Sequence, residues 1–199
     1  MIRRLPIIPT IIVALAVAAM IGLGIWQLQR AQWKEHLLAQ YRAAEKLPPI
    51  TWPSTPIKGD RLPLFRQATG VCLRAIGKRT VAGENRAGEP GFAQIIDCAT
   101  GAEGPGMSVE VGWSKNPNAR PDWHGGLVSG VIAPDHLTRM RLVAATAPPG
   151  LEPSAPPSIA SIPNNHRGYA IQWFAFAAVA LIIYGLAVRK RLREERPKP

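Results

Sequence analysis

Residues 168–188 read GYAIQWFAFAAVALIIYGLAV, a run of twenty-one uncharged positions between Arg167 and Arg189. A helix of about 20 residues rises about 30 Å, which matches the hydrocarbon thickness of a bilayer. Almost all side chains of this run are ones that lipid accepts readily. The run therefore predicts a transmembrane helix in the C-terminal part of the chain.

A second apolar run lies near the N-terminus. No charged residue occurs from position 5 to position 29, and residues 7–26 supply twenty helical positions. A basic start at Arg3 and Arg4 also fits a cleaved signal peptide, which is the alternative interpretation. The run extends to Trp26, beyond the core of a typical signal peptide, and this length favours a second membrane span.

The first helix is expected to continue beyond its span. Residues 27–44 contain no Gly or Pro and keep apolar side chains at helical spacing, until Pro48 and Pro49 end the pattern. Within the span, small residues recur every four positions, which suits close helix packing in lipid. These small residues are Ala14, Ala18 and Gly22.

The charges beside the two runs predict their orientation. Residues 189–198 carry six Lys or Arg and two Glu, whereas residues 31–167 carry fifteen basic and eleven acidic side chains. Basic residues next to a span stay in the cytoplasm, so we expect both termini there and the middle of the chain outside. The net charge of +11 thus indicates topology. It lacks the grouped basic face with interleaved aromatics of a nucleic-acid-binding protein, and nucleic acid is not an expected partner.

The middle of the chain has the pattern of a small β domain. From 50 to 141, short runs rich in Val and Ile alternate with Gly, Pro and Asn. Strands are predicted at 71–76, 92–97, 107–111 and 127–132, and they would form a small sheet or a partly closed barrel. The predicted fold class is therefore membrane α+β, with two transmembrane helices that flank a small, mainly β extracytoplasmic domain.

Six prolines between 147 and 163 predict an extended connector, biased to polyproline II, that returns the chain to the membrane. The full predicted organisation is a cytoplasmic N-terminus (1–6), a first transmembrane helix (7–26), a helical extension outside the membrane (27–47), a mainly β extracytoplasmic domain (48–146), a proline-rich connector (147–166), a second transmembrane helix (167–188) and a basic cytoplasmic tail (189–199).

The chain has two cysteines, Cys72 and Cys98, in the strand-like segments VCLRAIG and FAQIIDC. An exported domain lies in an oxidising space, where neighbouring strands would allow a disulfide between them. The alternative is two separately buried thiols that pack as small hydrophobic groups. Twenty-five residues separate them, which excludes a C-x-x-C redox or copper-shuttle site.

Two motifs at the outer ends of the spans resemble a known family. The first is GIWQLQR at 24–30, followed by Trp33 and Lys34, and the second is IPNNHRGYAIQWF at 162–174. Both look like motifs of the Surfeit locus protein 1 family, the assembly factors of haem–copper cytochrome oxidases. Their placement at opposite ends of one hairpin, with a similar intervening length, makes coincidence a poor explanation.

The resemblance is thinner in the middle domain. Residues 109–113, VEVGW, are similar to a family strand that ends in Gly-Trp, but Glu110 and Val111 stand where the family usually has Asn-Arg. The segment EPGF at 89–92 and the strand around Gly130 fit loosely. The middle domain therefore looks divergent, or adapted to a different oxidase.

The resemblance implies a non-enzymatic assembly factor that handles or stabilises haem A during its insertion into the main membrane subunit of the oxidase. Haem A would be a transient cofactor, and a haem A synthase a further partner beside the lipid bilayer. The alternative is a structural accessory subunit or scaffold of a respiratory oxidase that binds no haem. P-loops, nucleophile elbows, dinucleotide fingerprints and paired catalytic carboxylates are missing from the sequence, so an enzyme is not expected.

His166 is the first candidate site residue, because it lies just outside the second span. A neutral imidazole can ligate haem iron, and the resemblance implies that the matching histidine handles haem A. An ordinary headgroup or capping residue is the alternative. The other histidines, at 36, 124 and 136, show no metal-ligand spacing.

Tyr169, Ala170, Trp173 and Ala177 share a helix face with His166. The small residues leave a gap between the aromatics in which a flat macrocycle would fit, so Tyr169 and Trp173 are candidate cofactor-binding residues. The aromatic belt of a membrane interface explains both residues about as well.

Trp26, Arg30 and Trp33 share a face of the first helix. Arg30 could pair with a haem propionate, and Trp26 is the neighbouring candidate, whereas snorkelling and belt positions are the alternatives. Gln172 would make an interhelical hydrogen bond. One of Asn164 and Asn165 would cap the second helix.

The expected location is a bacterial cytoplasmic membrane, with the chain crossing it twice and the central domain in the periplasm. A mitochondrial inner membrane is less favoured, because the sequence begins almost directly at its first span and shows no Arg- and Ser-rich transit peptide.

Overall fold

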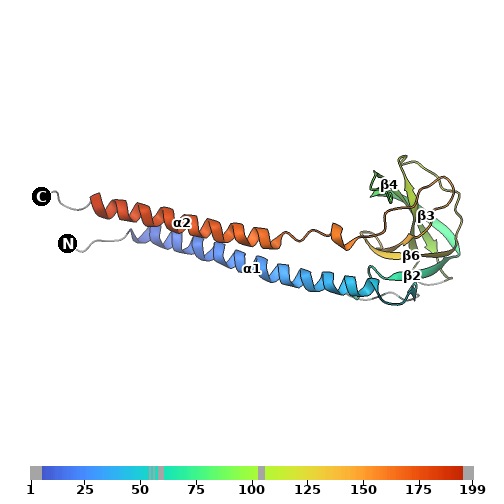
Figure 1. Cartoon of the computed structure of the whole chain (residues 1–199), viewed down its shortest axis with the longest axis horizontal. Coiled ribbons are helices and arrows are strands. Elements are labelled where there is room, and N and C mark those ends of the chain that lie inside the picture. The colour runs from blue at the N-terminus through green and yellow to red at the C-terminus, as the bar shows by residue number, and fades with distance from the viewer. Residues whose placement is uncertain (1–5, 54, 56, 58–60, 103–105, 195–199) are drawn as a thin grey trace. The chain divides into compact units, whose positions relative to one another are not determined.

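A computed structural model describes residues 6–53, 55, 57, 61–102 and 106–194 of the chain (Figure 1). The chain divides into two compact units, one made of residues 1–37 and 163–199, and the other of residues 38–162. The first unit is a pair of helices and the second is mainly β. Arg3, Arg4 and the end of the basic tail lie outside the described residues.

The helical unit is an antiparallel hairpin of α1 (Ile7–Glu45) and α2 (His166–Glu194). Pro9 is tolerated in the first turn of α1, where backbone N–H groups have no helical acceptor. Near the N-terminus of α1, Thr10 and Tyr184 hydrogen-bond through their hydroxyls. Both helices have apolar windows of mean hydropathy 2.5 and 2.1, and most side chains of these windows are exposed. A helix in the core of a soluble protein would have most of its apolar side chains buried, so the exposed apolar side chains of this hairpin suit lipid surroundings.

The two helices meet along a seam with seven-residue spacing. On α1 the buried seam residues are Val17, Gly24 and Ala31, and on α2 they are Ala170 and Ala177. A repeat of seven keeps one stripe facing the partner over several turns, as in a coiled coil. The small side chains leave room for larger partners: the Phe174 ring of α2 lies against Gly24, where an added Cβ would be 2.6 Å from it.

The packing face predicted for α1 is wrong. Ala14, Ala18 and Gly22 are exposed, and a Cβ added to Gly22 would meet no atom within 4 Å. Residues four apart rotate around a helix of 3.6 residues per turn, so they drift off the stripe that a seven-residue repeat maintains. Small residues do form the contact, but on a different face of the helix.

The second unit contains a seven-stranded mixed sheet in the order β1-β2-β6-β7-β5-β4-β3. The strands are β1 (Ile50–Thr51), β2 (Gln67–Cys72), β3 (Arg74–Glu84), β4 (Pro90–Ala99), β5 (Met107–Ser114), β6 (Gly126–Asp135) and β7 (Arg139–Ala144). The pairs β1–β2 and β5–β7 are parallel and the other pairs are antiparallel. Predicted strands 92–97, 107–111 and 127–132 lie inside β4, β5 and β6.

The predicted strand 71–76 is wrong, because the chain changes strand at Leu73. β2 ends at Cys72 and β3 begins at Arg74, yet these two strands lie far apart in the strand order. The Leu73 amide donates to the Ala99 carbonyl at the end of β4. The sheet therefore curves back on itself into a partly closed barrel. β1, β3 and β7 are additional strands that the sequence pattern missed, since polar and glycine residues interrupt their apolar runs.

The proline-rich segment is more than a connector. Glu152 bridges to Trp113 of β5, and Ser154 bridges to Asn85 after β3. A short 3₁₀ helix, η1 (Ile159–Ser161), then places Ile159 in the core of the β unit. Residues up to 162 therefore pack as part of this unit.

Candidate functional site

His166 is the first residue of α2 and is half-buried. Its Nδ1 atom lies 2.7 Å from Oε1 of Gln27 on α1. The helix begins here because the Asn165 carbonyl accepts the Tyr169 amide. The Asn164 side-chain oxygen is buried and accepts no hydrogen bond from any described residue, so of the two asparagines predicted as alternatives Asn164 is not a side-chain cap.

Two more cross-helix contacts surround the His166–Gln27 pair. Arg167 lies 2.9 Å from Glu35 of α1, and Lys34 donates to the Pro163 carbonyl. All of these residues belong to, or directly adjoin, the two motifs quoted from the sequence. The hairpin therefore brings together two segments that are more than 120 residues apart in the chain.

The face predicted around Ala170 and Ala177 is closed. These two side chains are only 1% and 4% exposed, because α1 packs against them. A flat macrocycle cannot lie in that gap, and this part of the prediction is wrong. Gln172 is exposed and makes no cross-helix hydrogen bond with the described residues; Gln27 supplies that bond instead.

The other candidates lie beside the seam. Arg167 and Glu35 pair across one side of the hairpin. On α1, Trp26, Arg30 and Trp33 share a helix face, and on α2, Tyr169 and Phe176 each precede a seam residue. We call these five residues together the aromatic edge.

The aromatic edge is open to the surroundings. Trp26 and Tyr169 are 53% and 51% exposed. The Arg30 guanidinium lies 4.0 Å from the centroid of the Trp33 ring, an attractive cation–π contact. Trp173 is half-buried at the seam and touches Phe176 edge to face, with 6.2 Å between ring centroids. The contacts that Arg30 and Trp173 make here are with aromatic rings of their own helices.

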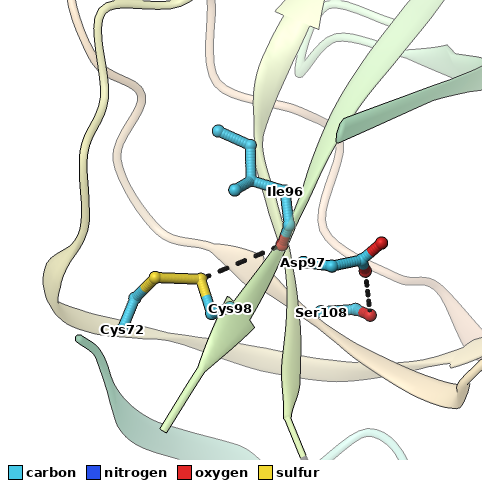
Figure 2. The surroundings of a disulfide bond; sticks show 5 residues. All are labelled: Cys72, Ile96, Asp97, Cys98 and Ser108. Atoms are coloured by element: carbon cyan, nitrogen blue, oxygen red, sulfur yellow. Dashed lines mark hydrogen bonds between the residues drawn. A yellow bond between two sulfur atoms is a disulfide. The ribbon is translucent and has the colours of Figure 1, made fainter. Parts of the chain in front are cut away.

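In the β unit, Cys72 and Cys98 form a disulfide that ties β2 to β4 (Figure 2). Both side chains are buried, and their Cα atoms are 5.3 Å apart. The bond closes the barrel near the bend at Leu73. It leaves neither cysteine as a free thiol for metal or redox chemistry.

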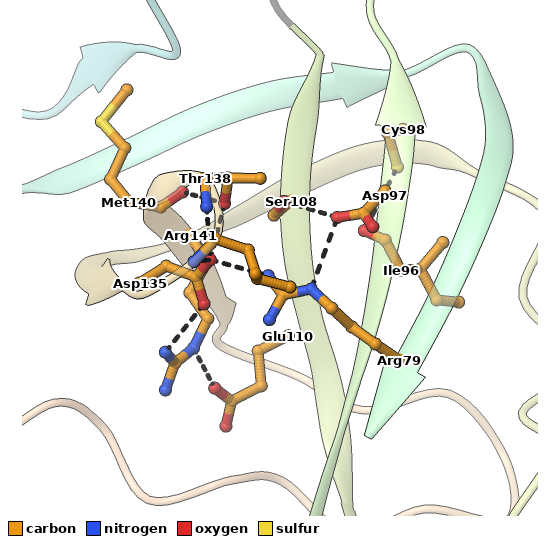
Figure 3. Close-up of polar contacts among 11 residues, drawn as sticks. Arg79, Ile96, Asp97, Cys98, Ser108, Glu110, Asp135, Thr138, Met140 and Arg141 are labelled. Carbon is orange, nitrogen blue, oxygen red and sulfur yellow. Dashed lines mark hydrogen bonds and ion pairs between the residues drawn. The ribbon is translucent and has the colours of Figure 1, made fainter. Parts of the chain in front are cut away.

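A buried ion cluster lies inside the β unit (Figure 3). Arg141 donates to Glu110 at 2.6 Å, and Arg79 donates to Asp135 at 2.9 Å. Burial raises the pKa of Asp135, but hydrogen bonds from Thr138 and the charge of Arg79 outweigh it and hold the pKa at about 2. The carboxylates of Glu110 and Asp135 therefore both form ion pairs with arginines. No group of His, Cys, Asp and Glu suited to a metal ion occurs among the described residues.

Three glycines of the middle segments have packing roles. A Cβ on Gly91 would lie 2.4 Å from the buried Trp113 ring, one on Gly112 would lie 2.8 Å from the Glu152 carbonyl, and one on Gly130 would lie 2.0 Å from the Val143 carbonyl. These positions accept only glycine. These three glycines of the loosely matching segments are therefore required by packing.

A comparison with models of protein families shows which family this chain belongs to. The SURF1 family matches residues 14–178, which includes both hairpin motifs and the whole β unit. The chain belongs to the SURF1 family. This family is associated with cytochrome oxidase assembly and is a family of assembly factors, not a known class of enzymes. A search of curated proteins found no match.

Glu110 and Val111 are the two positions at which the resemblance described from the sequence led to an expectation of Asn-Arg. The structure explains how the acid at position 110 is tolerated. Glu110 is 5% exposed and is neutralised by Arg141, while Val111 is part of the apolar core. The departure therefore concerns the interior of the β unit and leaves the hairpin motifs unchanged.

Proposed function

We propose that this chain is a non-enzymatic assembly factor that receives haem A at the mouth of its hairpin and holds it for insertion into the main membrane subunit of the oxidase. The observation that carries this proposal is the convergence of the two family-like motifs at His166. One imidazole, one exposed guanidinium and several exposed rings lie on or beside the aromatic edge.

These groups fit the parts of haem A. A neutral imidazole nitrogen is the usual protein ligand of haem iron. The Arg30 guanidinium can bind a propionate carboxylate through two parallel hydrogen bonds. Trp26 and Tyr169 offer exposed aromatic surface to the macrocycle. Haem A is the cargo in this proposal, and its iron and macrocycle are delivered unchanged.

The proposed setting is a bacterial cytoplasmic membrane. Both termini would be cytoplasmic and the β unit periplasmic, as the basic flanks of the spans predict. The main membrane subunit of the oxidase would be the recipient of haem A, and a haem A synthase would be its donor. Because the aromatic edge begins where α1 and α2 leave their apolar segments, cargo could reach it from the outer leaflet.

One observation favours a second candidate, a scaffold that binds no haem. His166, Arg167 and Lys34 all make cross-helix contacts, and these contacts alone would explain why such residues stand at the hairpin mouth. In that case the hairpin would only pack against an oxidase subunit, and the oxidase would contain its haem without this protein.

The test compares His166→Ala with His36→Ala in protein co-produced with a haem A synthase. His36 is a matched control because it is an exposed histidine of α1. We expect the unchanged chain and the His36 variant to carry haem A absorbance and the His166 variant to lose it. Equal absorbance in all three, or none in any, would exclude haem handling. Oxidase with normal haem but poor subunit association in a deletion strain would support the scaffold.

A further inference from the structure

The contact between Gln27 and His166 fixes more than the spacing of two helices. Oε1 of the Gln27 amide lies 2.7 Å from Nδ1 of His166 and can only accept a hydrogen bond, so with the amide in this orientation Nδ1 is the donor. In a neutral imidazole one nitrogen carries the proton and the other carries the lone pair. The contact therefore leaves Nε2 of His166 as the basic nitrogen.

This assignment reverses the preference of a free histidine. A neutral imidazole in water favours the proton on Nε2, which would block that atom as a ligand. Histidines that bind metals almost always donate their other N–H to a fixed acceptor, which sets the tautomer and makes the ligating nitrogen more basic. Gln27 meets this requirement from the opposite helix.

We propose that Gln27 is the positioning residue of the site: it holds His166 in the Nδ1–H tautomer and so makes Nε2 the iron-binding atom. The identity of the ligand rests on the proposed function, whereas the tautomer is a property of the chain alone. Gln27 would touch neither iron nor macrocycle, and would act only through the imidazole.

The position of Gln27 on α1 explains why this residue and no neighbour can act in this way. It lies on the seam, three residues after Gly24 and four before Ala31, and is half-buried. Gln29 and Gln32 are exposed and point away from the seam. The nearby charged residues of α1 have other partners, since Lys34 donates to Pro163 and Glu35 pairs with Arg167.

The first test measures the tautomer in haem-free protein. The full chain, with ¹⁵N-labelled histidine and in lipid nanodiscs, would be observed by NMR at about pH 8.5, where imidazoles are neutral. We expect the Nδ1–H form for His166 and the Nε2–H form for the exposed histidines at 36, 124 and 136. An Nε2–H signal from His166 would overturn the proposal.

Variants at position 27 make the test specific. Gln27→Leu removes the acceptor, and we expect His166 to revert to the Nε2–H form. Gln27→Glu keeps an acceptor oxygen at the same reach and should retain Nδ1–H, which separates the hydrogen bond from mere packing. Gln29→Leu is the matched control, since it changes an exposed glutamine of the same motif. An unchanged tautomer in Gln27→Leu would overturn the proposal.

The second test measures haem A binding by absorbance titration of the same proteins. Loss of an outer hydrogen-bond partner typically weakens metal binding about 10–100-fold. We expect that loss for Gln27→Leu, near-normal binding for Gln27→Glu and unchanged binding for Gln29→Leu. Equal binding by Gln27→Leu and the unchanged chain would refute the positioning role while leaving the proposed function intact. Absence of binding by the unchanged chain would refute the proposed function and the ligand assignment, and the NMR result would stand separately.

Discussion

Arg79 donates to Asp135 at 2.9 Å, although their strands are four places apart in the sheet. In a flat sheet, four steps of about 4.8 Å would separate β3 from β6 by about 19 Å. The pair can form only because the sheet closes into a barrel. The Asp135 side chain is 3% exposed and that of Arg79 is 16% exposed, so the pair reports directly on barrel closure.

The first prediction concerns acid stability. The pKa of Asp135 is lowered from 3.8 to about 2, so the folded barrel favours the charged carboxylate. This contribution is complete above about pH 4 and is lost as the pH falls through about 2, and the linkage amounts to about 2 kcal/mol. Denaturant unfolding of the full chain, followed between pH 5 and pH 2, should show the loss. A free energy of unfolding that does not change between pH 5 and pH 2 in the unchanged chain would contradict this prediction.

The second prediction concerns removal of that charge. Asp135→Asn removes the closer counter-ion of the buried Arg79 and leaves it only Asp97, 3.8 Å away, so we expect a loss of about 3 kcal/mol in the free energy of unfolding. The variant should also lose the pH dependence attributed to Asp135. Asp122→Asn is the matched control, because Asp122 is 88% exposed in its pair with His124. Equal stability of the two variants would show that the buried pair contributes nothing.

The third prediction concerns the disulfide. Cys72 and Cys98 are 26 positions apart, and a crosslink over such a loop is expected to stabilise the barrel by about 3 kcal/mol. The free energy of unfolding, measured by denaturation with and without a reducing agent, should differ by about that amount. The double variant Cys72→Ala with Cys98→Ala should be less stable and should no longer respond to the reductant. A reductant effect that persists in the double variant would rule out this explanation.

The fourth prediction concerns Gly130. An added methyl group would lie 2.0 Å from the Val143 carbonyl in the adjoining strand, and the backbone cannot yield without breaking the ladder. Gly130→Ala should destabilise the barrel by about 3 kcal/mol or more. Gly77→Ala is the comparison, because its Cβ would meet Asp97 at an ordinary 3.4 Å. Thermal unfolding of both variants should give a lower melting temperature for Gly130→Ala than for Gly77→Ala. Similar melting temperatures would argue against a special role for Gly130.

The fifth prediction concerns the hairpin seam. Ala177 is 4% exposed and Ala178 is exposed on the same helix. A leucine at 177 should force α1 and α2 apart, whereas a leucine at 178 should only meet lipid. Distances between spin labels on the two helices, measured in nanodiscs, should lengthen for Ala177→Leu alone. If both variants kept the distances of the unchanged chain, the seven-residue seam would be wrong.

The two membrane helices were predictable because lipid compatibility is a local property. Each apolar side chain in 168–188 adds its own transfer free energy, whatever it touches, so a run of sufficient length is visible without any knowledge of contacts. The candidates Trp26, Arg30, Tyr169 and Trp173 came from residues that share a helix face, and the motif resemblance supported the role of His166. The structure shows His166 in contact with Gln27, and Trp26 and Tyr169 exposed.

Other features were not predictable, because they depend on which segments meet. The spacing of Ala14, Ala18 and Gly22 suggested the wrong packing face, since only the partner helix selects a stripe. The bend at Leu73 was hidden inside an apparently continuous strand, because the sequence does not show where a sheet folds back.

The sequence by itself determined that this chain has two spans, a β domain between them and family-like motifs at the mouths of both spans. Only the tertiary structure decided that Gln27 faces His166, that Ala170 and Ala177 are covered, and that Arg79 reaches Asp135. The physical reason is the range of the interactions. Burial in lipid and charge beside a span act residue by residue, whereas hydrogen bonds and ion pairs require two atoms, far apart in the chain, to lie within about 3 Å.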